Sequence, residues 1–158
     1  MPAGTVTGVF LIESRPYADP VAAKLIAELQ AEYVTRYGGP DETPIEPGEF
    51  DPPDGLFLVG SLSGDAVAAG GWRRVGDGVA EIKRMYVAER ARRRGLSRRM
   101  LTELESTLTA AGYQRVVLMT AMAQPEAIAL YESTGYQVAE PYGIYACEPD
   151  ARFYAKPL

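Results

Sequence analysis

The sequence contains no histidine and only one cysteine, Cys147, among its 158 residues. The absence of histidine excludes Ser-His-Asp and Cys-His catalysis and most zinc sites. A single cysteine cannot form a disulfide within the chain, which agrees with a reducing compartment. Any general base must therefore be a carboxylate, a tyrosine, a lysine or water. No clustered acidic motif is present, so we predict no metal site.

Long apolar runs are also missing. No window approaches the roughly 18 apolar residues of a membrane span, and the apolar N-terminal stretch lacks the basic residues that open a signal peptide. We therefore expect no membrane association and a cytoplasmic location. The length fits one domain, 1–158, and the apolar fraction of 47% is ordinary for a soluble globular protein.

Apolar periodicity and turn residues predict an α/β fold. Helices are expected at 20–37, from 96 to about 112, and at 124–135. Strands are expected at 5–13, 56–62, 66–75, 79–87, 114–120 and 151–158. The stretch 38–55 has five prolines and six carboxylates without a lysine or arginine, a composition that does not favour a regular element. It is either a solvated loop or a mobile acidic lip over a site that receives a cation.

The stretch EIKRMYVAERARRRGLSRRML, residues 81–101, places six arginines within ten residues of a chain whose net charge is -5. It is predicted to pass from a strand into a helix. A helix N-terminus offers unpaired N–H groups and the positive end of the helix dipole, which together favour an anion. Gly95 allows a ligand to approach the backbone closely, and Ser97 is also small. The pattern therefore indicates a phosphate or pyrophosphate site.

Two familiar phosphate loops, G-x-x-x-x-G-K-[ST] and G-x-G-x-x-G, are absent. The arginine run also has two other interpretations, a solvated basic face or a nucleic-acid patch. One basic cluster in an acidic protein is weak support for nucleic acid, so no nucleic-acid binding is expected.

Two motifs resemble those of the GNAT superfamily of acetyl-CoA-dependent N-acetyltransferases. The first, V-x-x-x-x-[R/Q]-x-x-G-x-[G/A], spans Val87 to Ser97 and ends in serine. The second, N-x-x-A-x-x-L-Y-x-x-x-G-[FY], spans Gln124 to Tyr136 and begins with glutamine. The resemblance implies a mixed, mostly antiparallel sheet of six or seven strands flanked by about four helices. It also implies that the parallel fourth and fifth strands, 79–87 and 114–120, splay apart to admit the coenzyme.

The resemblance further implies how acetyl-CoA is held. Backbone N–H groups at the turn would bind the pyrophosphate, and the strand before the turn would pair with the pantetheine arm. The N–H near Met85 would also bind the thioester oxygen. The implied cofactor-binding residues are Met85, Tyr86, Val87, Arg92, Arg93, Arg94, Gly95, Leu96, Ser97, Arg98, Gln124 and Tyr131.

Two catalytic residues are implied in the same way. Tyr131 matches the tyrosine that donates a proton to the departing thiolate, although it could also simply pack in the core. Glu81 occupies a strand position where some members carry the general base. Alternation places Glu81, Lys83 and Met85 on one face of the strand. Glu81 could equally be a surface residue paired with Lys83 or Arg84, with water as the base.

The predicted reaction is direct transfer of an acetyl group from acetyl-CoA to a primary amine in a ternary complex. The favoured acceptor is a small molecule, and the alternative is a protein N-terminus or lysine. The alternative of another class is a non-catalytic acyl-CoA-binding sensor or a nucleic-acid-binding module. Because dimers are common in the family, the resemblance also allows a homodimer. Regions that border the acceptor in the family correspond here to Tyr33, Arg36, Tyr37, Trp72, Arg73, Arg74, Tyr142 and Tyr145.

Overall fold

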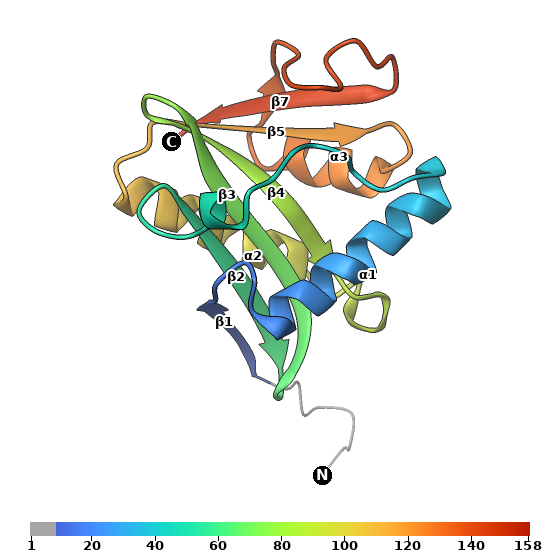
Figure 1. Cartoon of the computed structure of the whole chain (residues 1–158), viewed down its shortest axis with the longest axis vertical. Coiled ribbons are helices and arrows are strands. Elements are labelled where there is room, and N and C mark those ends of the chain that lie inside the picture. The colour runs from blue at the N-terminus through green and yellow to red at the C-terminus, as the bar shows by residue number, and fades with distance from the viewer. Residues whose placement is uncertain (1–8) are drawn as a thin grey trace.

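Seven strands and three α-helices form in residues 9–158, the part of the chain that the computed structural model describes (Figure 1). The helices are α1 (Pro20–Tyr37), α2 (Leu96–Ala110) and α3 (Pro125–Ser133). The strands are β1 (Phe10–Ser14), β2 (Gly55–Leu62), β3 (Asp65–Gly76), β4 (Val79–Val87), β5 (Arg115–Ala121), β6 (Gln137–Val138) and β7 (Ala151–Pro157).

The strands form one mixed sheet in the order β1-β2-β3-β4-β5-β7-β6. Only the β4–β5 pair is parallel, and the other neighbours are antiparallel. The mixed, mostly antiparallel sheet with a parallel pair at its centre is therefore confirmed. The last strand, β7, inserts between β5 and β6, a non-local arrangement that periodicity in the sequence does not encode.

Helices cover both faces of the sheet. Leu58 packs in the cluster that includes Leu101 and Leu104 of α2, whereas its neighbours Phe57 and Val59 pack with Leu25 of α1. Since successive strand residues point to opposite faces, α1 and α2 lie on opposite sides of the sheet. Tyr131 of α3 joins the α2 cluster, so α3 shares that side.

Several boundaries differ from the prediction. Three α-helices are present in the described residues where about four were expected, together with short 3₁₀ helices at Pro47–Phe50 and Glu89–Ala91. The expectation that 38–55 holds no regular element is wrong. A capping box between Glu46 and Glu49 starts the first 3₁₀ helix, and Phe50 is fully buried against Tyr17 and Phe57. Of the strand predicted at 5–13, residues 5–8 lie outside the described residues.

Within residues 9–158, no helix has the length and apolar content needed to cross a bilayer.

Candidate active site

The sheet opens at its centre because β4 and β5 separate. Their pairing covers only Val79–Arg115, Ala80–Val116 and Glu81–Val117. Beyond Glu81, β4 continues to Val87 without β5 as its neighbour. This is the splay that the resemblance implied, and two cavities lie around it.

A β-bulge at Arg84 changes the direction of side chains along β4. Arg84 has a φ of 62°, and the β3–β4 register shifts there. Lys83 and Arg84 consequently reach the same carboxylate, that of Asp41. Met85 instead packs with the α2 cluster, beside Gly70 and Leu104. The expectation that Glu81, Lys83 and Met85 share one face is therefore wrong, because a bulge breaks strict alternation.

The first cavity, of about 770 Å³, lies at the N-terminus of α2. Gly95 precedes the helix with a φ of 74°, and no side chain in residues 9–158 caps it. The first N–H groups of α2 are therefore available to a ligand, as pyrophosphate binding requires. The cavity is lined by every predicted cofactor residue except Arg94: Met85, Tyr86, Val87, Arg92, Arg93, Gly95, Leu96, Ser97, Arg98, Gln124 and Tyr131. We call it the coenzyme cavity.

The six arginines do not act as one basic cluster. Arg90 pairs with Asp65 at 3.0 Å, and Arg99 lies over the Phe10 ring. Arg92 lines the coenzyme cavity, but its guanidinium pairs with Glu32 and donates to the Val87 carbonyl. Arg93 and Arg98 line the cavity as well. The arginines at the turn therefore offer less unpaired positive charge to an anion than their count suggests.

Tyr131 lies where the coenzyme cavity meets a second cavity, and it lines both. Its side chain is almost fully buried, and burial raises the pKa of the phenol to about 12. The phenol is therefore protonated throughout the neutral range, as a general acid must be. Its ring packs edge-on against Tyr136 at 5.5 Å, which restricts its orientation.

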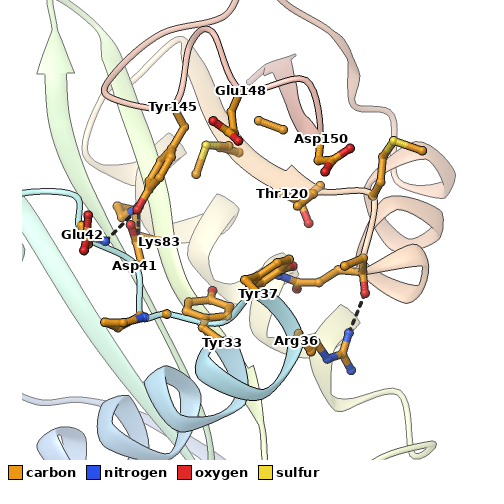
Figure 2. Close-up of a pocket in the computed structure, with 18 of the residues that line it drawn as sticks. Tyr33, Arg36, Tyr37, Asp41, Glu42, Lys83, Thr120, Tyr145, Glu148 and Asp150 are labelled. Carbon is orange, nitrogen blue, oxygen red and sulfur yellow. Dashed lines mark hydrogen bonds and ion pairs between the residues drawn. The ribbon is translucent and has the colours of Figure 1, made fainter.

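The second cavity, of about 880 Å³, is lined by the end of α1, the segment after it, β4, β5 and the loop before β7 (Figure 2). The Tyr145 hydroxyl accepts a hydrogen bond from the Glu42 N–H at 2.8 Å, which joins two of these segments. The Tyr37 hydroxyl accepts one from Gln124 Nε2 at 2.6 Å. We call this the acceptor cavity. It shares with the coenzyme cavity the residues Tyr33, Arg36, Met85, Gln124 and Tyr131.

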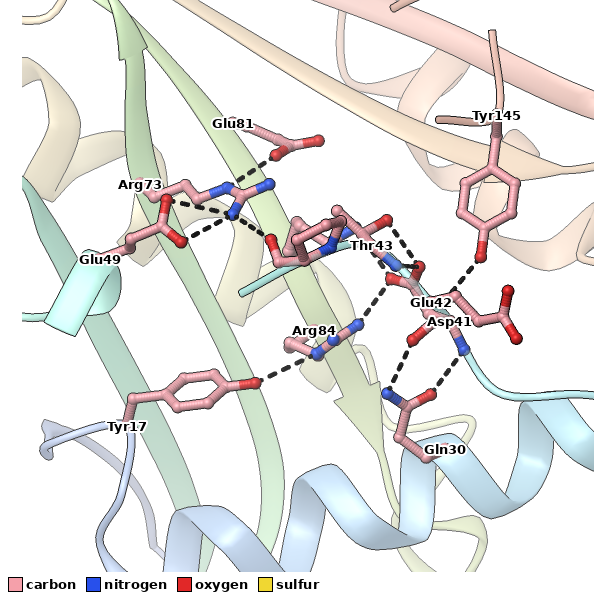
Figure 3. Close-up of polar contacts among 12 residues, drawn as sticks. Tyr17, Gln30, Asp41, Glu42, Thr43, Glu49, Arg73, Glu81, Arg84 and Tyr145 are labelled. Carbon is pink, nitrogen blue, oxygen red and sulfur yellow. Dashed lines mark hydrogen bonds and ion pairs between the residues drawn. The ribbon is translucent and has the colours of Figure 1, made fainter. Parts of the chain in front are cut away.

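Glu81 lines neither cavity. Its side chain is buried and pairs with Arg73 Nε at 3.0 Å, and Arg73 also reaches Glu49 and the Pro44 carbonyl (Figure 3). The predicted role of Glu81 as a base stays a prediction, but these contacts favour a structural role. The alternative that Glu81 is a surface residue paired with Lys83 or Arg84 is wrong, because Glu81 is buried and its partner is Arg73.

Among the predicted acceptor residues, Tyr33, Arg36, Tyr37 and Tyr145 line the acceptor cavity. Trp72 does not, because its indole donates to Thr107 on the α2 side. Arg73, Arg74 and Tyr142 also lie outside the cavity. Several lining residues were not predicted, among them Asp41, Lys83, Arg84 and Thr120. The acidic composition of 38–55 was the only available signal for Asp41, and nothing in the sequence marks Thr120.

Comparisons with known proteins identify the family of this chain. The family model described as the acetyltransferase (GNAT) family matches residues 23–136. An IAA acetyltransferase from Azospirillum brasilense is 32% identical over 151 residues, which cover 95% of this chain and 98% of the relative. A Klebsiella pneumoniae protein assigned as an acyl-CoA N-acyltransferase superimposes with a TM-score of 0.80 at 28% identity, over 95% of this chain and 98% of its own.

A more distant structure shares the fold. The PaiA N-acetyltransferase from Thermoplasma acidophilum, solved in complex with coenzyme A, has a TM-score of 0.71 at 14% identity, over 94% of this chain and 99% of its own. The family model covers most of the chain, and the A. brasilense relative matches over almost its whole length. The chain therefore belongs to the GNAT acetyltransferase family and is an acyltransferase.

Proposed function

We propose that this protein transfers an acetyl group from acetyl-CoA to the primary amine of a small molecule. The observation that carries the proposal is that the two cavities meet at Met85 and Tyr131. One cavity has the exposed N–H groups that suit a pyrophosphate, and the other has room for an acceptor. The acyl donor and the amine can thus approach each other without first acylating the protein.

A small acceptor is favoured over a protein because the acceptor cavity has walls from several segments of the chain. The segment after α1 forms one wall and is joined to the loop before β7 by the Tyr145–Glu42 hydrogen bond (Figure 2). A protein substrate would instead require an open groove. The A. brasilense relative is also named for IAA rather than for a protein.

In the proposed reaction, acetyl-CoA supplies the acetyl group as a thioester. The N–H groups at the start of α2 hold the pyrophosphate. The free stretch of β4 after Glu81 offers backbone groups to the pantetheine arm, and the N–H near Met85 faces the developing negative charge on the thioester oxygen. The amine nitrogen bonds to the carbonyl carbon, and the Tyr131 hydroxyl donates its proton to the sulfur as the C–S bond breaks. Water accepts the proton that the amine loses, and a proton from solvent restores the phenol.

The direct test is release of free thiol from acetyl-CoA in the presence of a panel of amines, with mass spectrometry to identify the acetylated product. We expect thiol release that depends on a small amine. Acetylation of peptides alone would instead establish the protein-acetyltransferase alternative. Tight acetyl-CoA binding without thiol release from any acceptor would indicate a sensor.

The Glu81→Gln variant tests the base. Since Glu81 is engaged by Arg73 and lies outside both cavities, we expect the pH–rate profile to keep its wild-type shape. The free energy of unfolding should fall by roughly 2 kcal/mol, because a charged partner of a buried arginine is lost. Chemical denaturation and initial rates from pH 6 to 10 measure the two effects. Loss of the acidic limb of the profile at unchanged stability would instead establish Glu81 as the base.

A further inference from the structure

Three charged side chains form a buried cluster in the wall of the acceptor cavity. Lys83 Nζ lies 2.9 Å and Arg84 Nη1 lies 2.7 Å from the same oxygen, Oδ2 of Asp41. All three side chains are less than 10% exposed, and all three line the cavity. We call them the Asp41 cluster (Figures 2 and 3).

The carboxylate of this cluster is firmly ionised. Burial alone would raise the pKa of Asp41, but the nearby Lys83 charge and hydrogen bonds from Thr43 outweigh burial and leave the pKa well below its usual value. The Thr43 N–H and hydroxyl donate to the other oxygen, Oδ1, at 3.0 and 2.7 Å. Gln30 of α1 holds the Asp41 backbone. The carboxylate is thus fixed in place and has little capacity for further donors.

The cluster carries one more positive charge than negative. The Arg84 guanidinium donates to Asp41 and to the Tyr17 hydroxyl. The Lys83 ammonium has three N–H donors, and Asp41 is its one carboxylate partner within residues 9–158. A buried charge without a full set of partners is unfavourable unless a ligand or water compensates it. The wall of the cavity therefore offers an ammonium to an anion.

The positive excess is local to the Asp41 cluster, because the whole lining of the cavity holds three cationic and four acidic side chains. Arg73 is matched by buried Glu81, and neither lines the cavity; its second partner, Glu49, has a side chain that is 40% exposed. Arg36 is matched by Glu126. The remaining carboxylates of the lining belong to exposed residues, where solvent screens them: Glu42, Glu148 and Asp150.

We propose that the acceptor is an amine that also carries a carboxylate, and that Lys83 binds this carboxylate. The inference rests on the proposed function, because it describes the acceptor of the same reaction. A single excess positive charge matches a monoanion better than a phosphate ester, which carries closer to two negative charges. The chemical class is therefore an amino acid or a similar amino-carboxylate, rather than a simple amine or a polyamine.

The experiment compares pairs of acceptors that differ only by a carboxylate: leucine with isopentylamine, tyrosine with tyramine and tryptophan with tryptamine. In the wild-type protein we expect kcat/KM to be higher for at least one carboxylate member than for its partner. In Lys83→Met we expect that ratio to fall about 10- to 100-fold, because a charge-assisted contact is lost. Comparing ratios cancels differences in amine basicity, since the same probes are used for both proteins.

Two further variants, Lys83→Arg and Lys156→Met, and one further pair of acceptors test whether the carboxylate preference comes from the Lys83 charge. Lys83→Met should fold, because Asp41 keeps Arg84 and Thr43, and unchanged acetyl-CoA affinity by calorimetry checks this. Lys83→Arg should keep the preference, because it keeps the charge. Lys156→Met removes a lysine paired with Glu105 outside both cavities and should keep the wild-type ratio. β-Alanine compared with phosphoethanolamine tests carboxylate against phosphate.

The outcomes separate this inference from the proposed function. No preference in the wild type, an unchanged ratio in Lys83→Met, or preference for phosphoethanolamine overturns the inference and leaves acetyl transfer intact. No thiol release from any amine overturns the proposed function. Binding then decides the inference alone: calorimetry of tyrosine and tyramine with the CoA-loaded protein should show a tyrosine preference that Lys83→Met lacks, and equal binding overturns it.

Discussion

Replacing Tyr131 with phenylalanine is expected to lower kcat by about 100- to 10,000-fold, the range that general-acid catalysis contributes. The phenol lies at the meeting point of the two cavities, and its pKa of about 12 keeps it protonated at neutral pH. Loss of one oxygen from a packed ring should leave the affinity for acetyl-CoA near that of the wild type. Thiol-release rates and calorimetry with acetyl-CoA measure the two quantities separately.

Tyr154→Phe is the matched control. Its ring lies 6.4 Å from that of Tyr131 in the same cluster, but its hydroxyl donates to Glu132 and it lines neither cavity. We expect kcat to stay within a few-fold of the wild type. The raised pKa of Tyr131 also predicts no alkaline fall in rate from this group below about pH 11. Wild-type turnover in Tyr131→Phe would remove the acid role.

The second large effect concerns Ser97→Glu. Ser97 lies in the first turn of α2 and lines the coenzyme cavity. A carboxylate there favours the helix through its dipole, but it would face the pyrophosphate, and such like-charge contacts cost several kcal/mol. We therefore expect KM for acetyl-CoA to rise about 100-fold or more, with an unchanged or slightly higher melting temperature.

Arg94→Glu provides the comparison for this variant. It reverses a charge three residues away, at an exposed side chain outside the cavity. Its effect on KM should be smaller and should diminish as salt is added, because solvent and ions screen exposed charges. Equal effects of the two substitutions would show that the overall positive electrostatic potential, rather than contacts with the turn itself, holds the coenzyme.

Local signals in the sequence predict much of the fold. Helix α1 is found at its predicted bounds because Asp19-Pro20 and Gly38 mark its ends, and Gly38 adopts the left-handed conformation of a helix C-cap. β4 also has its predicted bounds. Much of the coenzyme cavity could be predicted because most of its residues fall in one continuous strand-turn-helix segment and a second motif, whereas its α1 residues could not.

The acceptor side could be predicted only in part, since it depends on contacts between distant residues. The Asp41 cluster joins residues more than forty positions apart, and it requires a left-handed arginine that no residue preference indicates. The same left-handed residue places Met85 on the opposite face of β4 from the one predicted. Arg90 and Arg92 pair with Asp65 and Glu32, which lie far away in the sequence. The number of arginines along the chain therefore overstates the positive charge available at the turn.

The two cavities share five lining residues, but two segments line only the acceptor cavity. These are residues 38–42 after α1 and the loop before β7. Substitutions in those two acceptor segments can thus diversify the molecules that are modified without altering recognition of the shared donor. Directed evolution toward new acceptors should begin at residues 38–42 and 145–151.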